Sequence, residues 1–287
     1  MPQTINTNLT SINAQRNLSM SQSSLSVSMQ RLSSGLRVNS AKDDAAGLAI
    51  AERMTSQVRG MNVAIRNAND GISMSQTAEG AMGKVADSLQ RMRELSVQAA
   101  NATNSNSDKD SLDKEFGELA KEIQRVLGGT TFNGLNILGT EAAAFRFQVG
   151  ANTTADDTID ITTTDLTADA TISVVAGTDN TGSGRAVIDN TADATTIQGV
   201  IDNIDVALDT VNSQRAVMGA SQSRFESVIT NLQISVENQS AAKSRIMDTD
   251  FAVETANLSR VQILQQAGNA MVAQANQLPQ QVLTLLR

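Results

Sequence analysis

The chain has 287 residues, which suffices for one large domain or two ordinary ones, and it carries a formal net charge of −8. It contains no Cys, His, Trp or Tyr, and its only aromatic side chains are six phenylalanines. This composition excludes zinc centres, thiol nucleophiles, disulfides and every catalytic triad that needs an imidazole base. The negative charge and the scarcity of stacking rings also argue against a nucleic acid partner.

The N-terminal residues do not resemble a secretory signal peptide. Residues 1–20 contain one basic side chain, Arg16, and no sustained apolar run. No window of the chain approaches the eighteen apolar residues of a membrane span. The residues alone therefore favour a cytosolic protein, although an exported protein without disulfides would have the same composition.

The N-terminal arm is predicted to form long helices. Apolar residues recur there at heptad spacing, which is typical of helices that pack on other helices. Between Ser19 and Ser34, however, eight of sixteen residues are serine, so the first helix should be marginal on its own. The predicted packing positions are Leu18, Leu25, Met29, Leu32 and Leu36, followed by Met54, Val58, Met61, Ile65, Ala68 and Ile72.

Two short motifs mark turns in this arm. Either Asp43 or Asp44 should cap the helix that begins near residue 45, because a carboxylate there satisfies free amide groups. Asn133-Gly134 lies between two short apolar runs and predicts a hairpin turn, because both residues tolerate a positive φ angle.

The middle of the chain differs sharply in composition. Residues 151–196 contain thirteen Thr and eight Asp but no Glu or Lys, and Arg185 is their only basic side chain. Nearly all of the net charge of the chain lies there. Thr-rich runs separated by Gly and Asn predict short strands and turns that face solvent, with little core of their own.

The C-terminal arm returns to heptad spacing and ends on the apolar stretch 281–286. Such an end predicts helices that order against the N-terminal arm or against copies of the same chain. An antiparallel coiled coil within one chain is the simpler alternative. The predicted seam consists of Val261, Leu264, Gly268, Met271, Ala275, Leu278, Val282 and Leu285.

Candidate chemical sites are weak. Residues 248–250 begin like a calcium loop, but the apolar residues that follow cannot supply the remaining ligands. Arg91, Arg93 and Glu94 are expected on the solvated face of a helix. Because no nucleophile is paired with a base, neither an enzyme nor a cofactor or metal site is expected.

Two stretches resemble a known family. Residues 31–53 strongly resemble the N-terminal signature of bacterial flagellins, and residues 273–287 resemble the terminus of that family. Phe132-Asn133-Gly134 and residues 147–150 also look like elements of the family. The resemblance covers about residues 1–150 and 200–287, whereas the middle matches nothing comparable. Residues 31–53 read RLSSGLRVNSAKDDAAGLAIAER, and residues 273–287 read AQANQLPQQVLTLLR.

The resemblance implies a mainly α fold with a smaller β part. Both termini would form a long antiparallel helical bundle or coiled coil, with β-hairpins and a small variable insert in the middle. The implied domains are a terminal polymerisation domain (1–43 and 252–287), a helical bundle (44–138 and 197–251) and a solvent-exposed β-rich region (139–196).

The resemblance also implies a function. Flagellins leave the cell through the flagellar type III exporter without a cleaved signal peptide and polymerise into the extracellular filament used for swimming. The implied partners are other copies of the chain, the export chaperone, and the cap and hook-filament junction proteins. A hook-filament junction protein and a cytoplasmic coiled-coil signalling protein remain as alternatives.

One further site rests on the resemblance alone. Flagellins detected by the Toll-like innate receptor of animals carry an Arg, a Leu and a Glu on two neighbouring helices. The matching residues here are Arg91, Leu95 and Glu115.

Overall fold

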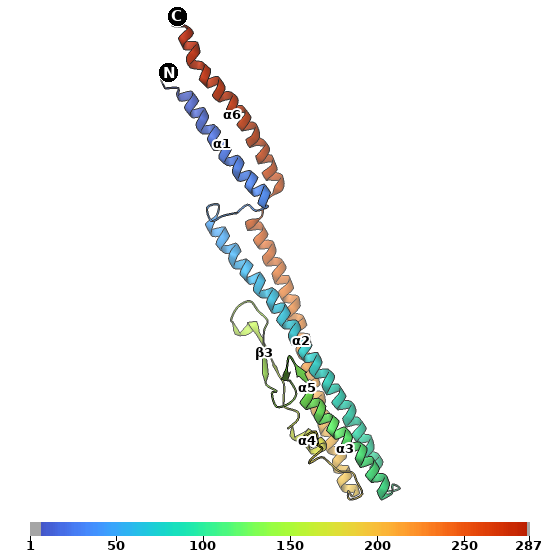
Figure 1. Ribbon diagram of the computed structural model, residues 1–287. Helices are drawn as coiled ribbons and strands as arrows, with labels where there is room; N and C mark the ends of the chain where they lie inside the picture. Colours follow the sequence, from blue (N-terminus) through green and yellow to red (C-terminus); the bar gives the residue numbers. More distant parts are fainter. Residues whose placement is uncertain (1–6, 286–287) are drawn as a thin grey trace. The chain divides into compact units, whose positions relative to one another are not determined.

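The computed structural model describes residues 7–285, with side chains as far as residue 277 (Figure 1). The mainly α fold with a small β part is confirmed. The elements are α1 (Leu9–Ser34), α2 (Ala45–Ala99), α3 (Asn106–Gly129), β1 (Thr131–Phe132), β2 (Leu135–Asn136), β3 (Ala144–Gln148), a 3-10 turn (Ala155–Asp157), β4 (Thr158–Thr162), α4 (Ala170–Ala176), α5 (Ala194–Met247) and α6 (Phe251–Leu285).

The contacts divide the chain into two compact units. A terminal unit comprises residues up to 56 and from 237 onwards, and a central unit comprises residues 57–236. Both boundaries fall inside long helices, since α2 and α5 each contribute one end to the terminal unit. The boundaries that the resemblance implies lie near residues 43 and 252, just before α2 and at the start of α6.

Local side chains fix where the helices begin. The Asp44 carboxylate accepts a hydrogen bond from the Gly47 amide at 2.8 Å, so the prediction of a cap before α2 is confirmed. Asp43 instead accepts from the amides of Asn39 and Ser40 in the preceding turn. Helix α3 starts with a reciprocal capping box between Ser105 and Asp108.

The predicted hairpin turn is also confirmed. Strands β1 and β2 pair antiparallel, with Phe132 opposite Leu135. Asn133 and Gly134 join them with φ angles of 51° and 82°, the left-handed values that a type I′ turn requires.

The second hairpin pairs β3 with β4, and its register places Arg146 opposite Asp160. The two side chains form an exposed ion pair, with Arg146 Nε 2.9 Å from Asp160 Oδ1. On the other face of β4, Ile159 and Ile161 are buried in the core of the central unit. The alternation of polar and apolar residues in β4 thus fixes which face of the hairpin packs inward.

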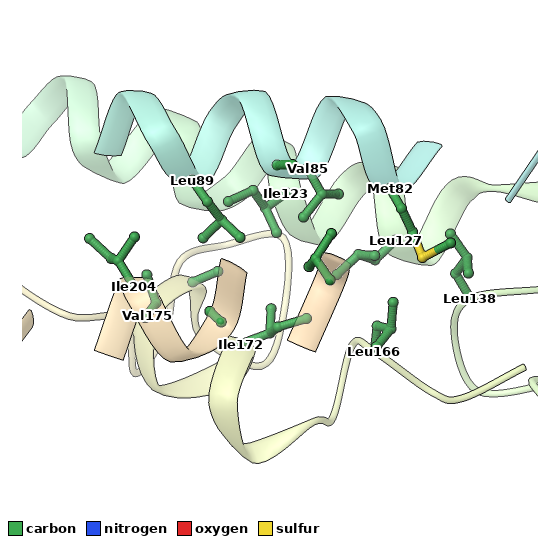
Figure 2. Close-up of a cluster of buried hydrophobic side chains, with 14 of the residues drawn as sticks. Met82, Val85, Leu89, Ile123, Leu127, Leu138, Leu166, Ile172, Val175 and Ile204 are labelled. Atoms are coloured by element: carbon green, nitrogen blue, oxygen red, sulfur yellow. The ribbon is translucent and has the colours of Figure 1, made fainter. Parts of the chain in front are cut away.

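The main core lies in the central unit and draws on both the helices and the middle segment (Figure 2). Leu89 of α2, Leu127 of α3 and Ile204 of α5 are fully buried there. They pack in one cluster with buried side chains from the 139–196 region: Val149, Ile159, Ile161, Leu166, Ile172, Val175, Ala176, Ile188 and Ala192.

Residues 139–196 therefore contribute apolar side chains to a core shared with the helices, which the expectation of a solvent-exposed region did not include. Most of the Thr and Asp residues of this segment occupy turns and outer faces, but isolated apolar residues between them fill the space beside α3 and α5. Composition averaged over the segment concealed this pattern. Residues 170–176 form helix α4, although short strands were expected in this segment, and Asp169 caps the helix through the Thr171 amide.

A buried ion pair fastens the middle segment to α3. Asp113 accepts from Arg185 Nη1 at 2.8 Å and from the Ile188 amide at 3.0 Å. Burial by itself raises the pKa of Asp113, but these hydrogen bonds outweigh it and hold the pKa below its ordinary value of 3.8. Arg185 also lies over the ring of Phe116, with its guanidinium carbon 5.9 Å from the ring centroid.

We predict that Asp113→Ala lowers the free energy of unfolding of the central unit by about 3 kcal/mol, because it leaves a mostly buried guanidinium unpaired. Asp160→Ala, which removes the exposed ion pair, should cost clearly less, because water screens that pair. Urea denaturation at pH 7 followed by circular dichroism measures both. Equal losses of unfolding free energy in the two variants would contradict a stabilising role for the buried pair of Asp113 with Arg185.

The same pair predicts a pH dependence. Because the pKa of folded Asp113 is depressed, its stabilisation is present above the unfolded pKa of about 3.8 and is lost as the pH falls through the folded pKa. The difference between the wild type and Asp113→Ala should therefore shrink below about pH 4. Denaturation curves recorded from pH 7 to pH 3 measure it.

Candidate functional site

Helices α1 and α6 pack side by side along their lengths in the terminal unit (Figure 1). The shielded positions on each helix recur every three or four residues, which defines one coiled-coil seam. On α1 they are Ser11, Ala14, Leu18, Ser21, Leu25, Ser28 and Leu32, and on α6 they are Glu254, Leu258, Val261, Gln265, Gly268, Val272 and Ala275.

Small and polar side chains bring the two helices close together. Ser11 Oγ donates to Asn276 Oδ1 at 2.7 Å, and Asn8 Nδ2 donates to the Ala275 carbonyl at 2.7 Å. A Cβ atom on Gly268 would lie 3.2 Å from Leu18 Cδ1, so Gly268 leaves room for that leucine. The seam therefore combines a few leucine contacts with polar contacts, and only Ser11 and Ser28 of α1 are buried.

The structure places the predicted assembly residues in different environments. Four of them are half-buried in the seam: Leu18, Leu25, Leu32 and Val261. Leu36 lies in the linker after α1, where its backbone forms an isolated antiparallel β-bridge with Asp248.

Two other predicted residues lie outside the seam. Leu264 and Met271 are exposed, because the α1-facing positions next to them are Gln265 and Val272. The apolar repeat predicted for α6 thus divides between two faces. Val261 lies in the seam, whereas Leu264 and Met271 lie outside it. Leu278, Val282 and Leu285 have side chains outside the described part of the chain.

Each terminal helix also carries exposed apolar side chains outside the seam, which we call the outward stripe. On α1 it consists of Leu9, Met20 and Val27, and on α6 of Val253, Leu264 and Met271. Both sets are spaced by eleven and then seven residues, which are close to whole numbers of helical turns. Leu9, Met20, Val27 and Val253 are not among the residues predicted for assembly, although this spacing could have revealed them.

A shallow groove between α1 and α6 adjoins this surface. Leu18 and Ala14 line it from α1, and Leu264, Gly268 and Met271 line it from α6. None of its lining residues is charged. The terminal unit thus presents apolar surface that its own fold does not cover.

The linkers before α2 and before α6 pair with each other. The Arg37 amide donates to the Met247 carbonyl at 2.6 Å, and the Thr249 amide donates to the Gly35 carbonyl at 3.0 Å. Asp250, part of the rejected calcium motif, accepts from the Ala252 amide and caps α6. Among residues 7–285, no cluster of three acidic side chains suited to a metal ion is found.

The three residues of the recognition motif do not share one environment. Arg91 is exposed and binds Glu94 at 2.9 Å on α2 and Glu115 at 2.9 Å on α3. These hydrogen bonds raise the pKa of Arg91, with that to Glu94 contributing most. Leu95, by contrast, is 1% exposed and belongs to the core, so its side chain is not available to a partner.

The neighbouring Arg93 forms an ion pair that the sequence did not predict. Its guanidinium binds the Asp205 carboxylate of α5 through two hydrogen bonds of 2.6 and 3.1 Å. These bonds hold the pKa of Asp205 below its ordinary value. The charged face of α2 is thus linked to both α3 and α5.

Fold and site together define a helical structural protein whose two ends pair with each other and present further apolar surface. The family model for the bacterial flagellin N-terminal helical region matches residues 5–143, and that for the C-terminal helical region matches residues 201–286. The chain belongs to the bacterial flagellin family. It is therefore a structural subunit of the flagellar filament rather than an enzyme.

Relatives match over nearly their full length. A flagellin of Halalkalibacterium halodurans is 46% identical over 99% of both chains, and one of Xenorhabdus nematophila is 43% identical over 100% of both chains. The crystal structure of Bacillus cereus flagellin is 31% identical, covers 58% of this chain and 88% of its own, and superposes with a TM-score of 0.48. In the described part of the chain, no helix is long and apolar enough to cross a membrane.

We predict that Gly268→Leu weakens the pairing of α1 with α6 by about 1–3 kcal/mol, because the new side chain overlaps Leu18. Amide hydrogen exchange in both helices should then become faster in the monomer. Ala270→Leu, which adds the same side chain at an exposed position of α6, is the control and should change little. Unchanged exchange in Gly268→Leu would show that the close approach at Gly268 does not hold the pair.

Proposed function

We propose that this chain polymerises into the flagellar filament through α1 and α6, that the flagellar type III apparatus exports it, and that the filament serves swimming. The observation that carries the proposal is the pair of outward stripes, which remain exposed after α1 and α6 have paired. Covering each large apolar side chain contributes roughly 1.5–3 kcal/mol by transfer, so six of them supply a substantial driving force.

The two stripes lie on different helices, which suits head-to-tail contact between copies. A surface that meets a different surface on the next copy forms a ring or an open helical filament instead of a closed dimer. The uncharged groove beside Leu264 and Met271 extends the area available for such contacts. We therefore place the subunit contacts on the terminal unit.

Export also agrees with the weakness of the terminal unit. Apart from the seam, α1 buries little, and its serines compete with the helical backbone, as in the hydrogen bond from Ser21 to the Asn17 carbonyl. Such a segment unfolds at low cost, which suits passage through a narrow channel. An export chaperone, the filament cap and the hook-filament junction proteins are the further partners that we propose from the family.

The two alternative functions have less support. A cytoplasmic signalling coiled coil does not explain the match to flagellin models at both ends of the chain. A hook-filament junction protein does not explain 46% identity over the full length of a flagellin.

The test is a double variant, Leu264→Glu with Met271→Glu, which places two charges in the outward stripe of α6. Because both side chains are exposed in the monomer, the fold should persist while seeded filament growth is lost. Electron microscopy after addition of filament fragments measures growth, and circular dichroism checks the fold.

Gln266→Glu with Ala273→Glu is the matched control for that variant. It adds the same two charges, seven residues apart, at exposed positions on another face of α6. Growth by the control alone supports the proposal. Normal growth of the stripe variant, or equal loss in both, contradicts the role of the stripe.

We further propose that the Toll-like innate receptor of animals recognises the monomer at Arg91 and Glu115. The resemblance supports these positions, and so does the exposed pair that they form across α2 and α3. Arg is a frequent anchor of protein interfaces, because its planar fork binds several acceptors and its stem packs on apolar surface. Leu95 would act only from within the core, by holding α2 in place.

We expect Arg91→Ala to reduce the potency of the monomer in receptor signalling roughly tenfold. Glu115→Ala should also reduce it, because Arg91 then loses its partner on α3. A receptor reporter assay with soluble monomer measures both. Arg125→Ala, which removes an exposed arginine elsewhere on α3, is the control. Full signalling by both test variants would exclude this site.

A further inference from the structure

Methionine is the main side chain of this protein that oxidants can modify. The chain has no Cys, Trp, Tyr or His, but it has eleven Met. Oxidation of the Met thioether to a sulfoxide converts a flexible apolar side chain into a polar one, and reductases reverse the reaction. The consequence of oxidation therefore depends on where the exposed methionines lie.

The exposed and buried methionines are separated between the two units. Met20, Met29 and Met271 are 56%, 55% and 63% exposed, and all three lie on α1 or α6. Met54 and Met247 are half-buried, and Met1 lies outside the described residues. The buried methionines all belong to the central unit: Met61, Met74, Met82, Met92 and Met218.

We propose that Met20 and Met271 are oxidation sites at which peroxide reversibly blocks assembly of the subunit. This inference rests on the proposed function, because it acts on the surface through which the chain polymerises. Hydrogen peroxide is the oxidant. Its O–O bond breaks, one oxygen atom bonds to a sulfur lone pair, and the remaining atoms leave as water, so the sulfur loses two electrons and the peroxide gains them.

The positions of Met20 and Met271 explain why their oxidation would oppose assembly. Met20 lies between Leu9 and Val27 in the stripe of α1, and Met271 follows Leu264 in the stripe of α6. Met271 also lines the groove between the two helices. A sulfoxide at either position places a strong hydrogen-bond acceptor on surface that assembly would bury, and burying it without a donor opposes association.

Met29 provides a control within the same helix. It is as exposed as Met20, but it lies nine residues away, which places it on the opposite side of α1. Peroxide should oxidise both residues, whereas only the sulfoxide at Met20 lies in the stripe. The buried methionines of the central unit should remain reduced while its fold persists.

The experiment compares the wild type, Met29→Leu and the double variant Met20→Leu with Met271→Leu, since leucine keeps the volume and polarity of methionine. Each monomer is treated with hydrogen peroxide and freed of it, and peptide mass spectrometry then locates the sulfoxides. Seeded filament growth is measured next. The critical concentration for growth should rise about tenfold or more in the wild type and in Met29→Leu, and much less in the double variant.

Treatment of the oxidised wild type with methionine sulfoxide reductases of both stereospecificities should restore growth. Normal growth of wild type that carries sulfoxides at Met20 and Met271, or loss of growth in the oxidised double variant, would overturn the proposal. Preferential oxidation of the buried methionines would overturn it as well. Failure of unoxidised protein to grow on seeds would instead overturn the proposed function, while the mass spectra would still decide which residues are oxidised.

Discussion

The close approach of α1 and α6 is the contact on which the arrangement of the terminal unit depends. Small residues such as Ala14 and Gly268 allow the helices to meet, and leucines at seven-residue intervals fill the space between them. Because the seam accepts few large side chains, the remaining apolar residues must lie on other faces. The outward stripes are therefore a consequence of how the seam is packed.

The two units differ in the interactions that stabilise each of them internally. The central unit has a continuous apolar core, to which helices and the middle segment both contribute, and the pair of Asp113 with Arg185 reinforces it from the rim. The terminal unit relies on a narrow seam with polar contacts and on paired linkers. A stable centre with weakly held ends suits the proposed function, in which the ends change state between export and assembly.

The same surface chemistry connects assembly with oxidation. A residue that contributes to association by being exposed and apolar is also accessible to oxidants while the subunit is free. Leucine would serve association equally well without this sensitivity, so the choice of methionine at positions 20 and 271 has a chemical consequence. Buried methionines such as Met82 carry no such consequence, since the core shields their sulfur atoms.

The sequence by itself determined the helical arms, a carboxylate cap at Asp43 or Asp44 and the turn at Asn133-Gly134, because these follow from local spacing and backbone preference. Its resemblance to flagellins indicated the family. Tertiary structure decided the faces and the partners. Heptad spacing could not tell which side of α6 meets α1, since Leu264 and Gln265 are adjacent and only packing against α1 selects between them. Nor could composition show that Ile172 and Arg185 are packed against α3, because burial depends on contacts between residues far apart in the chain.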